Sequence, residues 1–312
     1  MNPLHVLLVN RGHWFMLERI NGQFAYPVPE FTWEQRSVPK GFVVDLKALK
    51  GFDLVWWDDG KYGPPITHFS GRGAAPVVAH MLHGPHCQGH YEERRERARL
   101  NADAVALDTD NLARWKGLKP FQVSYSVNER YYQALPKTVD VGHYCVWQYT
   151  WEREALDEWL EGYCKRRGWT FGSNRGQDLQ ARYAAALGRC RVVVHLSRVG
   201  MTRPARLFDV AAAGGALLSN PMVGPAWETW TPGVHYAAFK RPSSAHFCIE
   251  KRCPRHYTDK DCEQVAEKLD WLIGQGHWEE VAAQGQQTVL AEHTWAVRAP
   301  QLRQKLNEVL GL

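Results

Sequence analysis

Two arginines and an aspartate at the start of a predicted helix carry the strongest chemical signal in the chain. Arg203, Arg206 and Asp209 follow one another at intervals of three residues in the segment TRPARLFDVAAA. The first turn of a helix has unpaired amides and a partial positive charge, and two guanidinium groups there favour binding of an anion such as phosphate. Asp209, one turn further along, is placed to accept hydrogen bonds from sugar hydroxyls. The alternative, an ordinary Arg–Asp pair on a surface helix, would contribute only about a few tenths of a kcal/mol. We interpret the segment as a pocket for a nucleoside diphosphate.

The surrounding residues predict the elements that would hold these side chains. Val192–Leu196 is a short, apolar and β-branched run typical of a buried parallel strand. Thr202 is a suitable N-cap, and Pro204 suits the first helical position because its missing amide hydrogen is not needed there. A double glycine then ends the helix before another short strand. The loop before the helix, which contains Gly200, would offer backbone amides to the same anion.

These residues resemble the donor-binding core of the GT-B glycosyltransferases. Arg206–Asp209 is followed by a helix of small residues, a double glycine, a short strand and a loop with Trp-Glu and Thr-Pro-Gly, and the segment HTWAVR lies near the carboxyl terminus. The pattern is similar to that of the spore-maturation (CgeB-like) group and the glycosyltransferase group 1 branch. The resemblance extends over residues 139–298. It implies a GT-B fold and a nucleotide-sugar donor, with UDP as the expected nucleotide and no required cofactor.

The resemblance also implies roles for individual residues. We expect the donor to be bound by Arg203, Arg206, Asp209, Thr202, Gly200, Arg175 and Glu228. The two helix arginines would bind the diphosphate and Asp209 the ribose. Arg175 is either a second phosphate contact or part of a plain turn, and Glu228 is either near the sugar or simply exposed. Related retaining enzymes carry a glutamate eight positions before the acidic residue, where this chain has Met201. The sugar contacts and the inverting or retaining outcome therefore stay open.

Three residues at the ends of predicted strands are candidates for a catalytic base. Inversion needs a base that takes the proton of the acceptor hydroxyl, whereas retention relies on stabilising the departing diphosphate. The candidate bases are Asp58, Asp59 and His13, although two adjacent aspartates in a turn also suit a solvated helix cap. A further loop that could supply a base contains the histidines His83, His86 and His90. Basic side chains in the same set of loops are expected to bind the acceptor: Arg11, His83 and His86.

Two groups of cysteines and histidines have side chains that can bind zinc. One consists of His83, His86, Cys87 and His90, and the other of Cys248, Cys253, His256 and Cys262. Neither spacing matches a standard zinc module, and the resemblance to GT-B glycosyltransferases argues against a catalytic metal. A structural zinc at the second group is an alternative to a plain loop.

The composition is that of a globular protein without a membrane segment. Of the 312 residues, 45% are hydrophobic and 23% charged, and no run approaches the roughly 20 apolar residues of a membrane-spanning helix. Seven scattered cysteines indicate a reducing compartment. We therefore expect a cytoplasmic protein, located in the host cytoplasm if it is viral. The formal net charge of +5 permits an anionic partner but does not require one.

Strands and helices alternate along the chain, which predicts parallel sheets covered by helices. The strands expected in the first half are 4–9, 52–57, 76–81, 104–107 and 121–126, with a helix at 92–101. In the second half we expect strands at 139–145, 169–172, 192–196 and 216–219, and helices at 152–167, 177–187, 205–213, 260–274, 277–290 and 300–310. The predicted fold class is α/β, with two Rossmann-like domains facing across a cleft. The expected divisions are an acceptor domain at 1–136, a donor domain at 137–292, and a helix at 293–312 that crosses back to the first domain.

The expected function is transfer of a sugar from a nucleotide-diphosphate donor to an acceptor hydroxyl. Basic residues in the first half give a slight preference for a hydroxymethylated pyrimidine in double-stranded DNA, as in viral DNA modification, over a surface polysaccharide or a protein. Met201 supports a further alternative, a non-catalytic module that binds a nucleotide or nucleic acid. A Rossmann-type dehydrogenase or epimerase is disfavoured because the first strand is not followed by G-x-G-x-x-G. The oligomeric state is not predicted.

Overall fold

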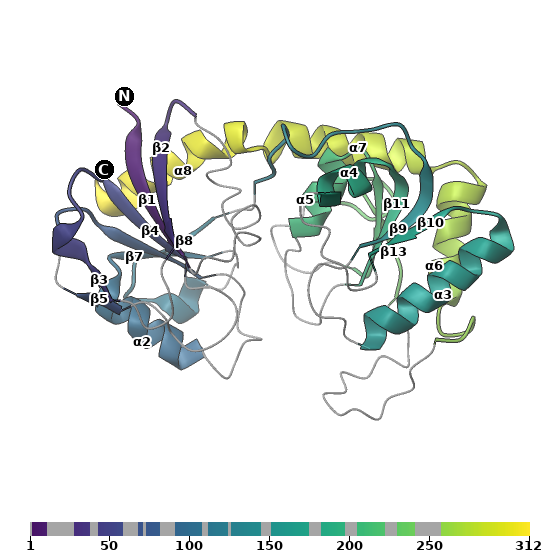
Figure 1. Ribbon diagram of the computed structural model, residues 1–312, viewed down its shortest axis with the longest axis horizontal. Helices are drawn as coiled ribbons and strands as arrows, with labels where there is room; N and C mark the ends of the chain where they lie inside the picture. Colours follow the sequence, from purple (N-terminus) through teal and green to yellow (C-terminus); the bar gives the residue numbers. More distant parts are fainter. Residues whose placement is uncertain are drawn as a thin grey trace. The chain divides into compact units, whose positions relative to one another are not determined.

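The computed structural model divides into two compact units, each built around one parallel sheet (Figure 1). It describes residues 2–10, 28–37, 43–58, 68–70, 73–81, 91–107, 112–123, 126–144, 151–174, 182–196, 205–221, 230–240 and 257–312. Unit 1 contains residues 1–128, 200–203 and 292–312, and unit 2 contains 129–199 and 204–291. Both termini therefore belong to unit 1. The predicted α/β class with two Rossmann-like sheets is confirmed.

Unit 1 has a six-stranded sheet in the order β2-β1-β4-β6-β7-β8, in which every pair is parallel. Its strands are β1 (Leu4–Asn10), β2 (Phe31–Ser37), β4 (Leu54–Asp58), β6 (Val77–Met81), β7 (Ala104–Leu107) and β8 (Pro120–Gln122). A separate parallel pair is formed by β3 (Val43–Asp45) and β5 (His68–Ser70). The central strands are mostly apolar because both faces of the sheet are covered, with exceptions such as His80 in β6 and Asp58 at the end of β4. The strand order reverses direction between β1 and β4.

The last helix of the chain, α8 (Trp295–Leu310), covers one face of the unit 1 sheet. The other face packs against α2 (Tyr91–Asn101), with the short helical turns Leu46–Ala48 and Leu112–Trp115 beside it. The sequence predicted that α8 begins at Pro300, and this was wrong by five residues. Thr294 caps the helix by accepting a hydrogen bond from the Val297 amide at 3.3 Å, so the helix starts before the proline and contains it.

Unit 2 has a five-stranded parallel sheet in the order β10-β9-β11-β12-β13. Its strands are β9 (Val139–His143), β10 (Phe171–Ser173), β11 (Cys190–His195), β12 (Ala216–Ser219) and β13 (Ala237–Ala238). Its helices are α3 (Trp151–Arg167), α4 (Tyr183–Gly188), α5 (Ala205–Ala212), α6 (Glu263–Leu269) with the π-helical turn Asp270–Gly274, and α7 (Trp278–Glu292). From β9 the chain first adds β10 on one side and then β11, β12 and β13 on the other, so the direction of strand addition reverses between β9 and β11. In parallel sheets ligands bind at this switch point, beyond the carboxyl ends of the strands.

The helix that carries the proposed anion site ends where the sequence predicts. Gly214 adopts a φ of 66°, a left-handed conformation that favours glycine, and its amide donates to the Ala211 carbonyl at 3.0 Å. The double glycine thus ends α5 and turns the chain into β12. Among the described residues, no helix is both long and apolar enough to cross a membrane.

The segment before β9 is bonded to unit 2. The Leu135 amide donates to the Gly188 carbonyl at 3.2 Å, and Lys137 Nζ donates to the carbonyls of Gly188 at 2.8 Å and Ala213 at 3.2 Å. These bonds attach residues 135–137 to the ends of α4 and α5. Residues 135–137 accordingly belong to unit 2.

Candidate functional site

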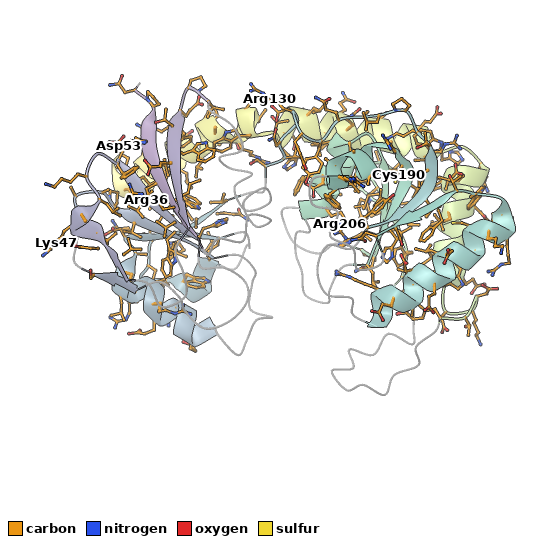
Figure 2. The ribbon with its side chains drawn as sticks, viewed as in Figure 1. Arg36, Lys47, Asp53, Arg130, Cys190 and Arg206 are labelled. Atoms are coloured by element: carbon orange, nitrogen blue, oxygen red, sulfur yellow. The ribbon has the colours of Figure 1, made fainter. Side chains whose placement is uncertain are left out.

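Arg206, which is labelled in Figure 2, lies in the first turn of α5. Two aromatic side chains of unit 2 hold its guanidinium. Its Nε donates to the Tyr183 hydroxyl at 2.8 Å, and its Nη1 lies 3.0 Å from Nδ1 of His195. The guanidinium carbon is 5.8 Å from the centre of the Tyr183 ring, within the range of a cation–π interaction. Because arginine can only donate, His195 must accept at Nδ1, and its ring is therefore neutral with the proton on Nε2.

The positive charge of Arg206 is buried without a counter-charge among the described residues. The side chain is only 4% exposed, and its two recorded partners, a phenol and a neutral imidazole, carry no charge. Within the part of the chain that the structure describes, no carboxylate pairs with it, so the ordinary Arg206–Asp209 ion pair of the alternative interpretation is not observed. A buried cation without a partner charge is costly, and an anion at the same place would relieve that cost.

Arg206 lies near the carboxyl edge of the unit 2 sheet, the edge at which ligands bind in parallel sheets of this kind. His195 is the last residue of β11, one of the two strands at the switch point, and α5 follows it in the chain. Asp209 lies one turn beyond Arg206 on the same side of α5 and is also buried, at 6% exposure. Ser219, the register partner of His195 on β12, has a buried hydroxyl that bonds to no other described residue. Polar groups therefore gather at the carboxyl edge of this sheet.

A second buried network lies at the same edge, on the strands β9 and β10. His143 is the last residue of β9, and its Nδ1 lies 2.9 Å from Asp157 Oδ1 on α3. The Ser173 hydroxyl, at the end of β10, donates to Asp157 Oδ2 at 3.0 Å. Asp157 thus holds two neighbouring strand ends together, with His143 only 1% exposed.

Sequence reasoning missed Tyr183, His195, His143 and Asp157. A signal was present for the histidines, since each is a polar residue near the carboxyl end of a predicted strand, at 139–145 and 192–196 respectively. The pairing with Tyr183 and Asp157 had no such signal, because these residues are 23 positions from Arg206 and 14 from His143. Only the folded chain brings them together.

Most of the other residues predicted for the site lie outside the described residues. These are His13, Asp59, Arg203, Thr202, Gly200, Arg175, Glu228, Arg11, His83 and His86. Asp58 is the last residue of β4 and faces His80 of β6 in the register of the sheet. The roles proposed for Asp58 and for the ten residues outside the described part of the chain stay predictions.

The zinc question also falls largely outside the described residues. Cys87, His90, Cys248, Cys253 and His256 are not among them. Cys262 is described and fully buried, and burial raises the pKa of its thiol to about 12. In the described part of the chain no group of three or more His, Cys, Asp or Glu side chains could hold a metal ion.

His80 is a buried histidine in unit 1 with no polar contact to any other described residue. It is 1% exposed, and its ring centre lies 5.3 Å from that of Trp56. Neither ring nitrogen has a hydrogen-bond partner in the described part of the chain. Burial lowers its pKa to about 4, so the imidazole is neutral at physiological pH.

Comparison with known proteins agrees with this architecture. Residues 151–304 match a family model described as "Glycosyl transferase-like". No curated protein sequence matches the chain. Among solved structures, Anabaena Alr3699/HepE in complex with UDP is similar with a TM-score of 0.61 at 11% identity, covering 98% of this chain and 100% of that chain. A glycosyltransferase from Rickettsia africae ESF-5 has a TM-score of 0.52 at 9% identity and covers 99% of both chains. TarM has a TM-score of 0.54 at 12% identity, covering 81% of this chain and 54% of that chain.

The fold of these neighbours is the GT-B glycosyltransferase fold, and this chain shares it. The family match falls on α3 to α8, the part of the chain that contains Arg206, Asp209 and the switch point of unit 2. The GT-B fold and the family match over residues 151–304 together make this chain similar to glycosyltransferases of that architecture.

Proposed function

We propose that the protein transfers a sugar from a UDP-sugar to an acceptor hydroxyl and that Arg206 binds the diphosphate. The buried guanidinium without a counter-charge carries this proposal, because it lies at the first turn of a helix beside the switch point of a parallel sheet. Relatives of the same fold support the choice of nucleotide: HepE has been crystallised with UDP and with UDP-glucose. The finer family assignment, the spore-maturation branch, is part of the proposal.

Arg206 would act on the leaving group of the reaction. The acceptor oxygen bonds to the anomeric carbon while the bond from that carbon to the β-phosphate oxygen breaks, and UDP departs with the electron pair. A cation in a buried site from which water is excluded stabilises the negative charge that develops on the diphosphate more strongly than a cation in water does. Asp209 would accept hydrogen bonds from the ribose hydroxyls. The remaining donor contacts are proposed at Arg203, Thr202, Gly200, Arg175 and Glu228.

The acceptor proton needs a destination if the transfer inverts the anomeric configuration. Asp58, Asp59 and His13 are the proposed bases, since in the sequence each lies at or shortly after the carboxyl end of a strand of the unit 1 sheet. Arg11, His83 and His86 are the proposed acceptor contacts. None of these roles requires a metal.

For the acceptor we propose a saccharide or a protein hydroxyl. The preference for a DNA acceptor rested on positive charge in the first half of the chain. The described arginines of α2 offer less exposed and unpaired positive charge than their number in the sequence suggests. Arg97 is buried at 7% exposure, and Arg99 is paired with Glu96 at 2.6 Å. The comparisons offer no support for a DNA acceptor. One neighbour of the fold is a pneumococcal O-GlcNAc transferase.

Calorimetric titration with UDP tests the diphosphate role. Arg206→Ala removes the charge and should weaken UDP binding by about 10- to 100-fold, as expected for a charged hydrogen bond. Arg166→Ala is the matched control, because Arg166 is an exposed arginine of the same unit that is paired with Asp259. Unchanged UDP affinity in a folded Arg206→Ala variant would contradict the proposal. A non-catalytic module would bind UDP but release no sugar from a UDP-sugar, so a donor-hydrolysis assay separates that alternative.

A further inference from the structure

We propose that Tyr183 and His195 are positioning residues that fix the Arg206 guanidinium for the diphosphate while leaving its charge uncancelled. This inference rests on the proposed function of Arg206. Both side chains accept hydrogen bonds from the guanidinium, at Nε and Nη1 respectively. For the third nitrogen, Nη2, no partner is found among the described residues, so it is the donor available to a ligand.

The two contacts determine the orientation of the group. A guanidinium is planar, and hydrogen bonds to two of its nitrogens from different elements fix both its plane and its rotation in that plane. The Tyr183 hydroxyl comes from α4 and the His195 ring from the end of β11. Tyr183 is 3% and His195 5% exposed, so neither acceptor can turn away into solvent. Less side-chain entropy is then lost when the anion binds.

The chemical type of the two acceptors matters more than their number. A carboxylate in either position would hold the guanidinium at least as firmly, through a charge-assisted bond. It would also neutralise the charge that is needed for the diphosphate. A phenol and a neutral imidazole hold the group without neutralising it.

Another tyrosine–arginine contact in the same unit shows the opposite arrangement. Arg167 Nε donates to the Tyr163 hydroxyl at 3.2 Å, and the guanidinium lies 5.6 Å from the ring centre. Here, however, the Arg167 charge is paired with the carboxylate of Asp270. Because its charge is neutralised by Asp270, we interpret the Arg167–Tyr163 contact as structural. It serves as a control in which the same two residue types meet without a proposed ligand.

The decisive experiment compares His195→Asn with His195→Asp. Both residues place an acceptor oxygen near the position of Nδ1, and they differ only in charge. We expect His195→Asn to bind UDP within about threefold of the wild type, and His195→Asp to bind at least about tenfold more weakly, because its charge opposes that of the diphosphate. Calorimetry gives the affinity, and thermal unfolding with and without UDP gives the stability. If His195 were only structural, the aspartate variant would bind UDP as well as the asparagine variant, and that result would overturn the inference.

Tyr183→Phe tests the second acceptor and keeps the test usable if the His195 variants do not fold. It removes one oxygen but leaves the ring against the guanidinium, and we expect UDP binding to weaken by about tenfold with little change in the melting temperature. Tyr163→Phe, the matched control, should leave UDP affinity unchanged. Equal affinity of Tyr183→Phe and the wild type would contradict the positioning role. If Arg206→Ala also binds UDP normally, the proposed function itself fails; if Arg206→Ala is impaired and Tyr183→Phe is not, only this inference fails.

Discussion

At the scale of single residues, His80 is a side chain whose burial makes the stability of the fold depend on pH. Its pKa is lowered to about 4 by burial, from 6.5 in an unfolded chain. Between these values the unfolded state binds a proton that the folded state does not, so stability falls as the pH drops from 6.5 to 4. We expect His80→Phe to reduce this loss, and urea denaturation at a series of pH values measures it. An equally steep loss in the variant would show that other groups cause the acid sensitivity.

Arg206 shows how far single residues can be interpreted from the sequence. Its spacing from Pro204 and the double glycine predicted its place in the first turn of a helix, and α5 begins at Ala205. The sequence could not predict that its partners are neutral, because Tyr183 and His195 reach it from other elements. The same holds for His143, whose partner Asp157 lies on α3. Residue type and local position were predictable, whereas the charge balance of the site depends on contacts between elements.

At the scale of elements, Lys137 connects the carboxyl-terminal ends of α4 and α5 to the start of β9. Its ammonium donates to two main-chain carbonyls, and burial lowers its pKa to about 8 from 10.5. Lys137→Met removes both bonds, so we expect it to lower the free energy of unfolding by about 1–2 kcal/mol at pH 7. Between pH 8 and 10.5 the unfolded state binds more protons than the folded state at this lysine, so its contribution to stability rises with pH.

The measurement is denaturant unfolding of both proteins across this pH range. The difference between wild type and Lys137→Met should widen as the pH rises from 8 to 10.5. Lys137→Arg serves as the control, since a guanidinium keeps the donors but does not lose its proton. A difference that narrows with pH would mean that the lysine is not desolvated as the structure indicates.

Elements on the edge of a sheet were harder to predict than those in its centre. The central strands β4, β6 and β7 are largely apolar runs because both of their faces are covered. Among the described strands β2 pairs with β1 alone, and its exposed residues Glu34 and Arg36 follow the buried Phe31 and the partly buried Trp33. The alternation in FTWEQRS was the available signal. It was missed because an edge strand need not be apolar throughout.

At the scale of the whole molecule, the net charge of +5 bears on the choice between acceptors. A protein that holds DNA releases one counterion for each phosphate that it neutralises, so its affinity falls steeply with salt. The described cations of α2 include Arg97, which is buried, and Arg99, whose charge is shared with Glu96 in an exposed ion pair. A saccharide or protein acceptor does not require a set of unpaired lysines and arginines to contact phosphates.

We therefore expect any binding to duplex DNA to be weak and transfer to saccharide or protein acceptors to respond only slightly to salt. Fluorescence anisotropy with a duplex containing hydroxymethylated pyrimidines, between 50 and 200 mM salt, measures the first. Mass spectrometry of DNA, glycan and protein substrates after incubation with UDP-sugars measures the second, with Arg206→Ala as the control for donor-dependent transfer. Six or more phosphate contacts would reduce DNA affinity by roughly a thousandfold over that range. Tight, steeply salt-dependent binding of DNA, together with transfer of sugar to DNA, would contradict the saccharide or protein acceptor and favour DNA. The cations that contact the phosphates would then have to come from residues of unit 1 outside α2.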